Sequence, residues 1–179
     1  MYKRQVSVLC DWQIRNLSLG HGMVVPFNEE LLNPASIDVL LGEHLMIEDP
    51  MNTAMRKISM RGYTQQDPYW LRPGEFVLAE TQETFDLPEH ISGQFALKSS
   101  RARDGYSHML AGWCDPGWHG SKLTLELQNA RKMHSLPLYP GLKIGQIIFF
   151  EMSERPIKSY AEVGHYNNDK TVSGSKVNP

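Results

Sequence analysis

The sequence has few cysteines and no long apolar run. Its two cysteines, Cys10 and Cys114, are far too few for a disulfide scaffold and are typical of a reducing compartment. No run approaches the roughly 20 apolar residues that span a bilayer. The best candidate, Ile144 to Phe150, is interrupted by Gly145 and Gln146. We therefore expect a cytoplasmic protein with no membrane partner.

The sequence also lacks a strong excess of either charge. Its 18 lysines and arginines and 20 aspartates and glutamates give a formal net charge of −2, so there is no broad positive field to attract a nucleic acid backbone. A few local arginines could still hold a small anion. A length of 179 residues suits one domain whose core needs no disulfide or metal. We predict a single domain over residues 1–179 and no nucleic acid partner.

Motifs for metal chemistry are missing as well. Zinc-dependent cytosine deaminases need a His-x-Glu element and a Pro-Cys-x-x-Cys element, and neither occurs. The seven histidines show no ligand-like pairing. There is no glycine-rich P-loop and no Gly-x-Ser-x-Gly elbow. We expect no zinc site and no metal ligand from the protein itself.

Short apolar runs separated by Pro, Gly and Asn make up most of the chain, which is typical of an antiparallel β sandwich or barrel. The predicted strands cover residues 36–41, 75–79, 91–97, 122–127 and 144–150. Near the start, Asp11 precedes residues 12–17, and this pattern predicts a short capped helix ended by Gly20 and Gly22. Residues 51–67 are polar and weakly patterned, so we expect them to leave the sheet.

The last stretch, residues 164–179, is rich in Asn, Ser, Gly and Lys and has almost no core-forming side chains. It is either a disordered tail or a lid that orders over a ligand. Composition alone favours the flexible tail.

One predicted strand carries a carboxyl group in its middle. Leucines alternate through residues 122–129, so a strand turns Thr124, Glu126 and Gln128 to one face. If that face is exposed, Glu126 is a solvated surface carboxylate, and strand alternation alone favours this interpretation. If the face lines a cleft, partial desolvation would raise the pKa of Glu126 toward the range useful for moving protons.

Two further polar segments have both a plain and a functional interpretation. Residues 98–105 begin with Lys98, Ser99 and Ser100; they form either a capped surface turn or a helix start whose N–H groups and nearby cations suit phosphate oxygens. Residues 115–120 contain Asp115 before a Pro-Gly turn, which an ordinary hairpin connection also explains.

Taken together and in order, these segments resemble the dCTP deaminase family, which shares a superfamily with the trimeric dUTPases. The resemblance covers most of the chain except residues 51–67 and the final dozen. It implies a mainly β, dUTPase-like distorted β-barrel that is jelly-roll-like with short helices. It also implies a homotrimer with active sites between subunits, and Mg²⁺ bound through the nucleotide triphosphate. The matching segments are Leu9–Asp11, Pro34–Gly42, Leu71–Glu75, Lys98–Arg103, His108–Gly112, Asp115–Trp118, Thr124–Asn129 and Pro140–Gln146.

The resemblance implies hydrolytic deamination of dCTP to dUTP and ammonia, with Glu126 as the proton shuttle. The related dUTPases lack a glutamate at this strand position, so Glu126 favours deamination over pyrophosphate cleavage alone. Ser99 and the backbone carbonyl of Ala111 would hold the water and later the ammonia, and Arg103 would steady the charge of Glu126.

Binding roles follow from the same resemblance. Backbone groups around Cys114 and Asp115, with the Gln146 amide, would read the base edge. Candidates for the triphosphate are Lys98, Ser100 and Tyr160.

The chain departs from the family pattern in its tail and in one loop. His165 replaces a cation with a group that is mostly neutral at pH 7, and Asp169 brings an acid near the expected phosphates. Lys170 or Lys176 could compensate for these changes. Leu110 stands where the family generally has threonine.

Three functions stay open beside the leading one. A bifunctional deaminase and dUTP diphosphatase would give dUMP, because in trimeric dUTPases the aspartate at the place of Asp115 helps position the water that attacks the α-phosphate. A deaminase could instead act on a modified or less phosphorylated cytosine deoxynucleotide. A non-catalytic nucleotide-binding regulator belongs to another class, and the presence of Glu126, Ser99 and Arg103 argues against it.

Overall fold

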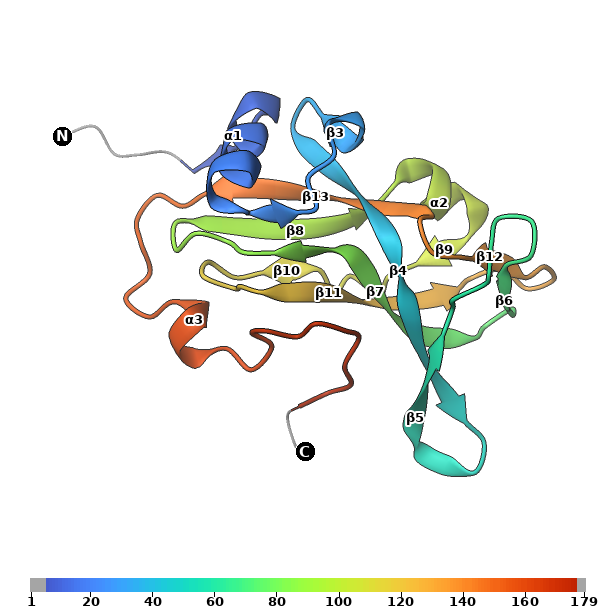
Figure 1. Ribbon diagram of the computed structural model, residues 1–179. Helices are drawn as coiled ribbons and strands as arrows, with labels where there is room; N and C mark the ends of the chain where they lie inside the picture. Colours follow the sequence, from blue (N-terminus) through green and yellow to red (C-terminus); the bar gives the residue numbers. More distant parts are fainter. Residues whose placement is uncertain (1–5, 177–179) are drawn as a thin grey trace.

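Short alternating strands pair into an antiparallel sheet that curls around an apolar core (Figure 1). The computed structural model describes residues 6–176, and within them the main sheet has 11 strands in the central order β10-β8-β13-β4-β7-β11-β9. These strands are β1 (Ser7–Val8), β2 (Val24–Val25), β3 (Leu32–Asn33), β4 (Ser36–Asp49), β5 (Asn52–Ser59), β7 (Phe76–Phe85), β8 (Ile91–Leu97), β9 (Tyr106–Ser107), β10 (Trp113–Cys114), β11 (Ser121–Asn129) and β13 (Lys143–Glu151).

The remaining elements are short. A separate pair of strands joins β6 (Tyr69–Leu71) to β12 (Leu136–Leu138). The helices are α1 (Asp11–His21), the 3₁₀ turn η1 (Glu29–Leu31), α2 (Ser99–Asp104) and α3 (Tyr160–Val163). The predicted mainly β fold with short helices is therefore confirmed.

The two faces of β7 and β11 have different neighbours. Leu125 of β11 pairs with Ala79 and Leu127 pairs with Val77, and all four side chains are fully buried in the core. Because side chains alternate along a strand, the next positions turn to the opposite face. Glu126 pairs there with Leu78, and Thr124 pairs with Glu80. We call this second side of the two strands the outer face.

Two sequence expectations about elements were wrong in part. The first helix begins at Asp11 and is capped by Cys10, whose N–H donates to the Gln13 side chain at 3.1 Å. It continues through Gly20 and ends at Gly22, where φ is 69°. Residues 52–59 do not leave the sheet but form β5, which pairs with β4. Figure 1 shows this β4–β5 hairpin projecting from the body of the molecule. Its polar composition reflects exposure rather than absence of strand pairing.

The chain end returns to the sheet after α3. Residues 164–176 run beside the outer face (Figure 1), where the Val172 side chain is buried. Residues 177–179 of the predicted tail, and residues 1–5 of the predicted domain, lie outside the described part. The predicted single domain and the flexibility of the tail stay predictions.

Replacing Gly42 by alanine should destabilise the protein. A Cβ atom at Gly42 would lie 2.6 Å from Cγ of Glu80 and 2.9 Å from the backbone oxygen of Thr81. Such overpacking costs about 1–3 kcal/mol of unfolding free energy. The matched control is Gly20→Ala in α1, where nothing lies within 4 Å of the added atom and helix propensity favours alanine by about 1 kcal/mol. Urea unfolding measures both changes, and equal effects of the two substitutions would contradict this packing.

The buried carboxyl of Glu83 should make stability fall as pH rises. Burial raises its pKa from 4.5 to about 7, although N–H groups, including that of Leu40 at 3.1 Å, favour the charged form. Between pH 4.5 and about 7 the folded chain binds more protons than the unfolded chain, so raising the pH lowers the free energy of unfolding. The loss amounts to roughly 3 kcal/mol.

In Glu83→Gln the amide oxygen can still accept from Leu40, but the side chain no longer titrates. We therefore expect this variant to gain stability relative to the natural chain as pH rises from 4.5 to 8 in urea unfolding. The exposed Glu48→Gln serves as the control. Parallel curves for the natural chain and Glu83→Gln would contradict the assignment.

Candidate active site

A cavity of about 760 Å³ opens on the outer face of β11. Its walls come from residues 110–115, from β11, from α3 and from the tail. Its floor includes Leu78 and Glu126, which are cross-strand neighbours. Five of the residues predicted from the sequence line this cavity: Glu126, Ala111, Cys114, Asp115 and Tyr160.

Glu126 is held in the cavity by its buried neighbours. Leu125 and Leu127 point into the core, so the backbone of β11 cannot rotate the carboxyl group away. Its Oε2 atom is buried and has no hydrogen-bond partner within residues 6–176. Burial raises the pKa of Glu126, and a hydrogen bond from backbone only partly offsets this. A carboxyl group with a raised pKa and an oxygen free to bind a ligand is suited to taking up and releasing protons.

The loop before β10 brings backbone groups to the cavity in a strained conformation. Met109 and Leu110 have φ angles of 54° and 61°, a left-handed region that costs a non-glycine residue about 1–2 kcal/mol. The Gly112 carbonyl accepts from the Phe95 N–H at 2.7 Å, which ties the loop to β8. A Cβ atom at Gly112 would lie 2.9 Å from the Phe95 oxygen, so the close approach requires glycine. Ala111 is thereby fixed at the cavity wall.

Asp115 is oriented by a residue that sequence reasoning missed. The indole N–H of Trp113 donates to Oδ1 of Asp115 at 3.0 Å, and the Trp113 ring packs against Phe150 at a centroid distance of 6.1 Å. Both Trp113 and Asp115 line the cavity. A single tryptophan in a short strand carries no sequence signal for this role.

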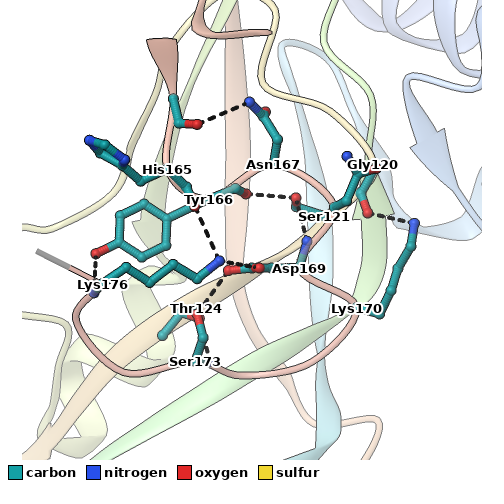
Figure 2. Close-up of polar contacts among 12 residues, drawn as sticks. Gly120, Ser121, Thr124, His165, Tyr166, Asn167, Asp169, Lys170, Ser173 and Lys176 are labelled. Atoms are coloured by element: carbon teal, nitrogen blue, oxygen red, sulfur yellow. Dashed lines mark hydrogen bonds and ion pairs between the residues drawn. The ribbon is translucent and has the colours of Figure 1, made fainter. Parts of the chain in front are cut away.

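The tail forms the remaining wall of the cavity (Figure 2). The backbone oxygen of Tyr166 accepts from the indole N–H of Trp118 at 2.9 Å and from the Ser121 hydroxyl at 2.8 Å. The backbone oxygen of Asp169 accepts from the Lys122 N–H at 2.8 Å. Further along, the Ser173 N–H donates to the Thr124 hydroxyl at 3.4 Å. The tail is therefore attached along β11 as far as Thr124, which precedes Glu126 on the same face of the strand.

A second carboxyl group of the outer face anchors the tail, and it too was missed. Glu80 is fully buried, and its Oε2 atom accepts the Val172 N–H at 2.6 Å. Its Oε1 atom contacts His44 Nδ1 at 3.0 Å and Lys122 Nζ at 3.2 Å. Burial opposes the charge, but these partners and the Thr171 side chain outweigh it and lower the pKa of Glu80. No local pattern in the sequence reveals this role, because its partners come from distant segments.

Other predicted residues lie away from this cavity in the same chain. Ser99, Ser100 and Arg103 are on α2, which Figure 1 places at the opposite end of the sheet from α3. Lys98 forms an ion pair with Asp38 at 2.6 Å. Gln146 and Lys170 also have partners within the chain. The Gln146 side-chain oxygen accepts from the Ser36 hydroxyl at 2.7 Å, and the Lys170 ammonium donates to the Gly120 backbone oxygen at 2.7 Å.

Within residues 6–176, no three side chains of His, Cys, Asp or Glu come close enough together to hold a metal ion. In the same range, each helix is too short or too polar to cross a bilayer.

Comparisons with known proteins agree with one another. Residues 8–152 match the sequence profile of the dCTP deaminase-like family. A dCTP deaminase, dUMP-forming, from Methanoregula boonei is 37% identical over 87% of this chain and 89% of its own length. Another protein of the same name, from Corynebacterium glutamicum, is 36% identical over 95% of this chain and 96% of its own length.

Solved structures support the dUTPase-like β fold. The 2′-deoxycytidine 5′-triphosphate deaminase of Agrobacterium tumefaciens matches 83% of this chain with a TM-score of 0.66 at 20% identity, and the match spans 49%, about half, of that protein's chain. A mutant dUTPase of S. aureus phage phi11 matches 87% of this chain and 96% of its own, with a TM-score of 0.50 at 14% identity. On the profile match and the identity to its relatives, this chain belongs to the dCTP deaminase-like family.

Proposed function

We propose that this protein deaminates dCTP by hydrolysis and cleaves the product further to dUMP. The observation that carries the deamination is Glu126, a carboxyl group in a cavity, with a raised pKa and a buried oxygen that has no partner among residues 6–176. The names of the relatives support dUMP as the product. They favour the bifunctional alternative over release of dUTP, which was the main expectation from the sequence.

Glu126 can carry each proton that the deamination needs. Its carboxylate takes a proton from water as the water oxygen bonds to C4 of the cytosine, and passes this proton to N3. It then moves the proton of the new hydroxyl to the amino group. The C4–N bond breaks, ammonia leaves with the bonding electrons, and a C4 carbonyl remains. Burial raises the pKa of Glu126, which makes its carboxylate a better proton acceptor than an exposed one and suits this exchange.

Backbone and side-chain groups around Glu126 position the reactants. The Ala111 carbonyl, held in the strained loop, would accept a hydrogen bond from the water and later from ammonia. For the second reaction, Asp115 would orient a water molecule toward the α-phosphate, with Trp113 fixing its carboxylate. Mg²⁺ carried by the triphosphate oxygens would neutralise charge on the departing diphosphate.

A second copy of the chain would complete the site. Ser99, Ser100 and Arg103 on α2 are exposed, and none of the three lines the cavity of its own chain. In a homotrimer, α2 of one subunit would reach the cavity of the next and bring Arg103 to Glu126 and to the phosphates. This arrangement accounts for a cavity that holds the predicted shuttle but lacks the predicted arginine.

The direct test is to incubate the purified protein with dCTP and Mg²⁺ and to measure ammonia, dUTP and dUMP. We expect ammonia and dUMP in equal amounts. Ammonia with dUTP would overturn the second reaction alone. Binding of dCTP without product would overturn both reactions and indicate a nucleotide-binding regulator.

Glu126→Gln should lower ammonia release by at least about 10³-fold, because the amide cannot shuttle protons. Binding of dCTP, measured by calorimetry, should change little. The exposed Glu154→Gln is the matched control and should keep full activity. Full ammonia release by Glu126→Gln would contradict the proposed mechanism.

A further inference from the structure

The cavity of one chain carries more negative than positive groups. Asp115, Glu126 and Asp169 line it, and Lys122 is the lysine among the lining residues. The Lys122 ammonium is bound to the buried Glu80 at 3.2 Å, so its charge is already balanced. Asp169 is balanced in the same way by Lys176, so the phosphates of a nucleotide would meet ion-paired groups at this wall.

Asp169 is held at that wall by its backbone. Its N–H donates to the Ser121 hydroxyl at 3.0 Å (Figure 2). Its carbonyl accepts from the Lys122 N–H at 2.8 Å. Both partners begin β11, so Asp169 cannot move away without detaching the tail from this strand. Its side chain is only 16% exposed.

The carboxylate of Asp169 collects donors that suit a phosphate group. The Lys176 ammonium contacts Oδ1 in an ion pair, and the Ser173 hydroxyl donates to Oδ2 at 2.9 Å. Lys176 is further held by the carbonyl of His165 at 3.1 Å and lies 5.2 Å from the centre of the Tyr166 ring. Figure 2 shows these groups converging on Asp169. An ammonium and a hydroxyl arranged around one anion are also the groups that bind phosphate oxygens.

We infer that Asp169 is a specificity-determining residue that competes with substrate phosphates for Lys176 and Ser173. Its carboxylate acts as an internal anion, so a nucleotide must displace it before the tail can contact the phosphates. This inference rests on the proposed function, because it assumes that the ligand is a deoxycytidine nucleotide. Because the competition concerns phosphate charge, it weakens the binding of dCTP more than the binding of dCMP.

The test compares nucleotide binding by Glu126→Gln alone and by Glu126→Gln combined with Asp169→Asn. Both are measured by calorimetry with Mg²⁺, and Glu126→Gln is present in both so that deamination does not consume the ligand. Asparagine keeps the size of the side chain and can still accept from Ser173, but it lacks the charge that holds Lys176. We expect the Kd for dCTP to fall about tenfold, which equals about 1.4 kcal/mol, and the Kd for dCMP to change less than threefold, or about 0.6 kcal/mol.

Two further variants control this result. Asp67→Asn removes one negative charge from an exposed loop and should leave both Kd values unchanged. In the double variant Asp169→Asn with Lys176→Met, the gain for dCTP should disappear, because the released ammonium is absent.

Three outcomes would overturn the inference. These are an unchanged or raised Kd for dCTP in Asp169→Asn, an equal gain for dCTP and dCMP, and a gain that persists without Lys176. A raised Kd would show that the pair mainly fastens the tail. Failure of the natural sequence to bind any deoxycytidine nucleotide would instead overturn the proposed function, so the two failures are distinguishable.

Discussion

The antiparallel pairing of β11 with β7 is the constraint on which the cavity depends. Burial of Leu125 and Leu127 against Val77 and Ala79 fixes the register. Since side chains alternate, that register places Glu126 on the outer face. A slip by one residue would send the carboxyl group into the core and expose the leucines, at a large cost in buried apolar area. The position of the proposed shuttle is thus a consequence of core packing.

The outer face holds two carboxyl groups whose surroundings push their pKa values in opposite directions. Glu80 is buried with His44, Lys122 and the Val172 N–H as partners, and its pKa is lowered. Glu126 is partly buried with an unpartnered oxygen, and its pKa is raised. The first group therefore stays charged and fastens the tail, while the second is suited to exchanging protons. The cavity forms between the outer face, which carries both carboxyl groups, and the tail, which Glu80 anchors.

Local patterns predicted what depends on local physics. Alternation of leucines identified the strand of Glu126 and the face on which it lies, and turn residues marked most strand boundaries. The roles of Glu80 and Trp113 could not be predicted, because each depends on partners that the fold brings from elsewhere. Composition also misjudged residues 52–59, since an exposed strand needs few apolar side chains. The residues of α2 were predicted in the site, yet in one chain they do not line the cavity.

The proposed function requires that the cavity around Glu126 becomes an active site only with α2 of another copy. Mixing two inactive variants, Glu126→Gln and Arg103→Ala, tests this requirement. After dissociation and reassembly in equal amounts, about a quarter of the sites in a random trimer combine an intact Glu126 with an intact Arg103. We expect ammonia release from dCTP to return to about a quarter of the natural rate. A mixture no more active than its separate components would contradict it.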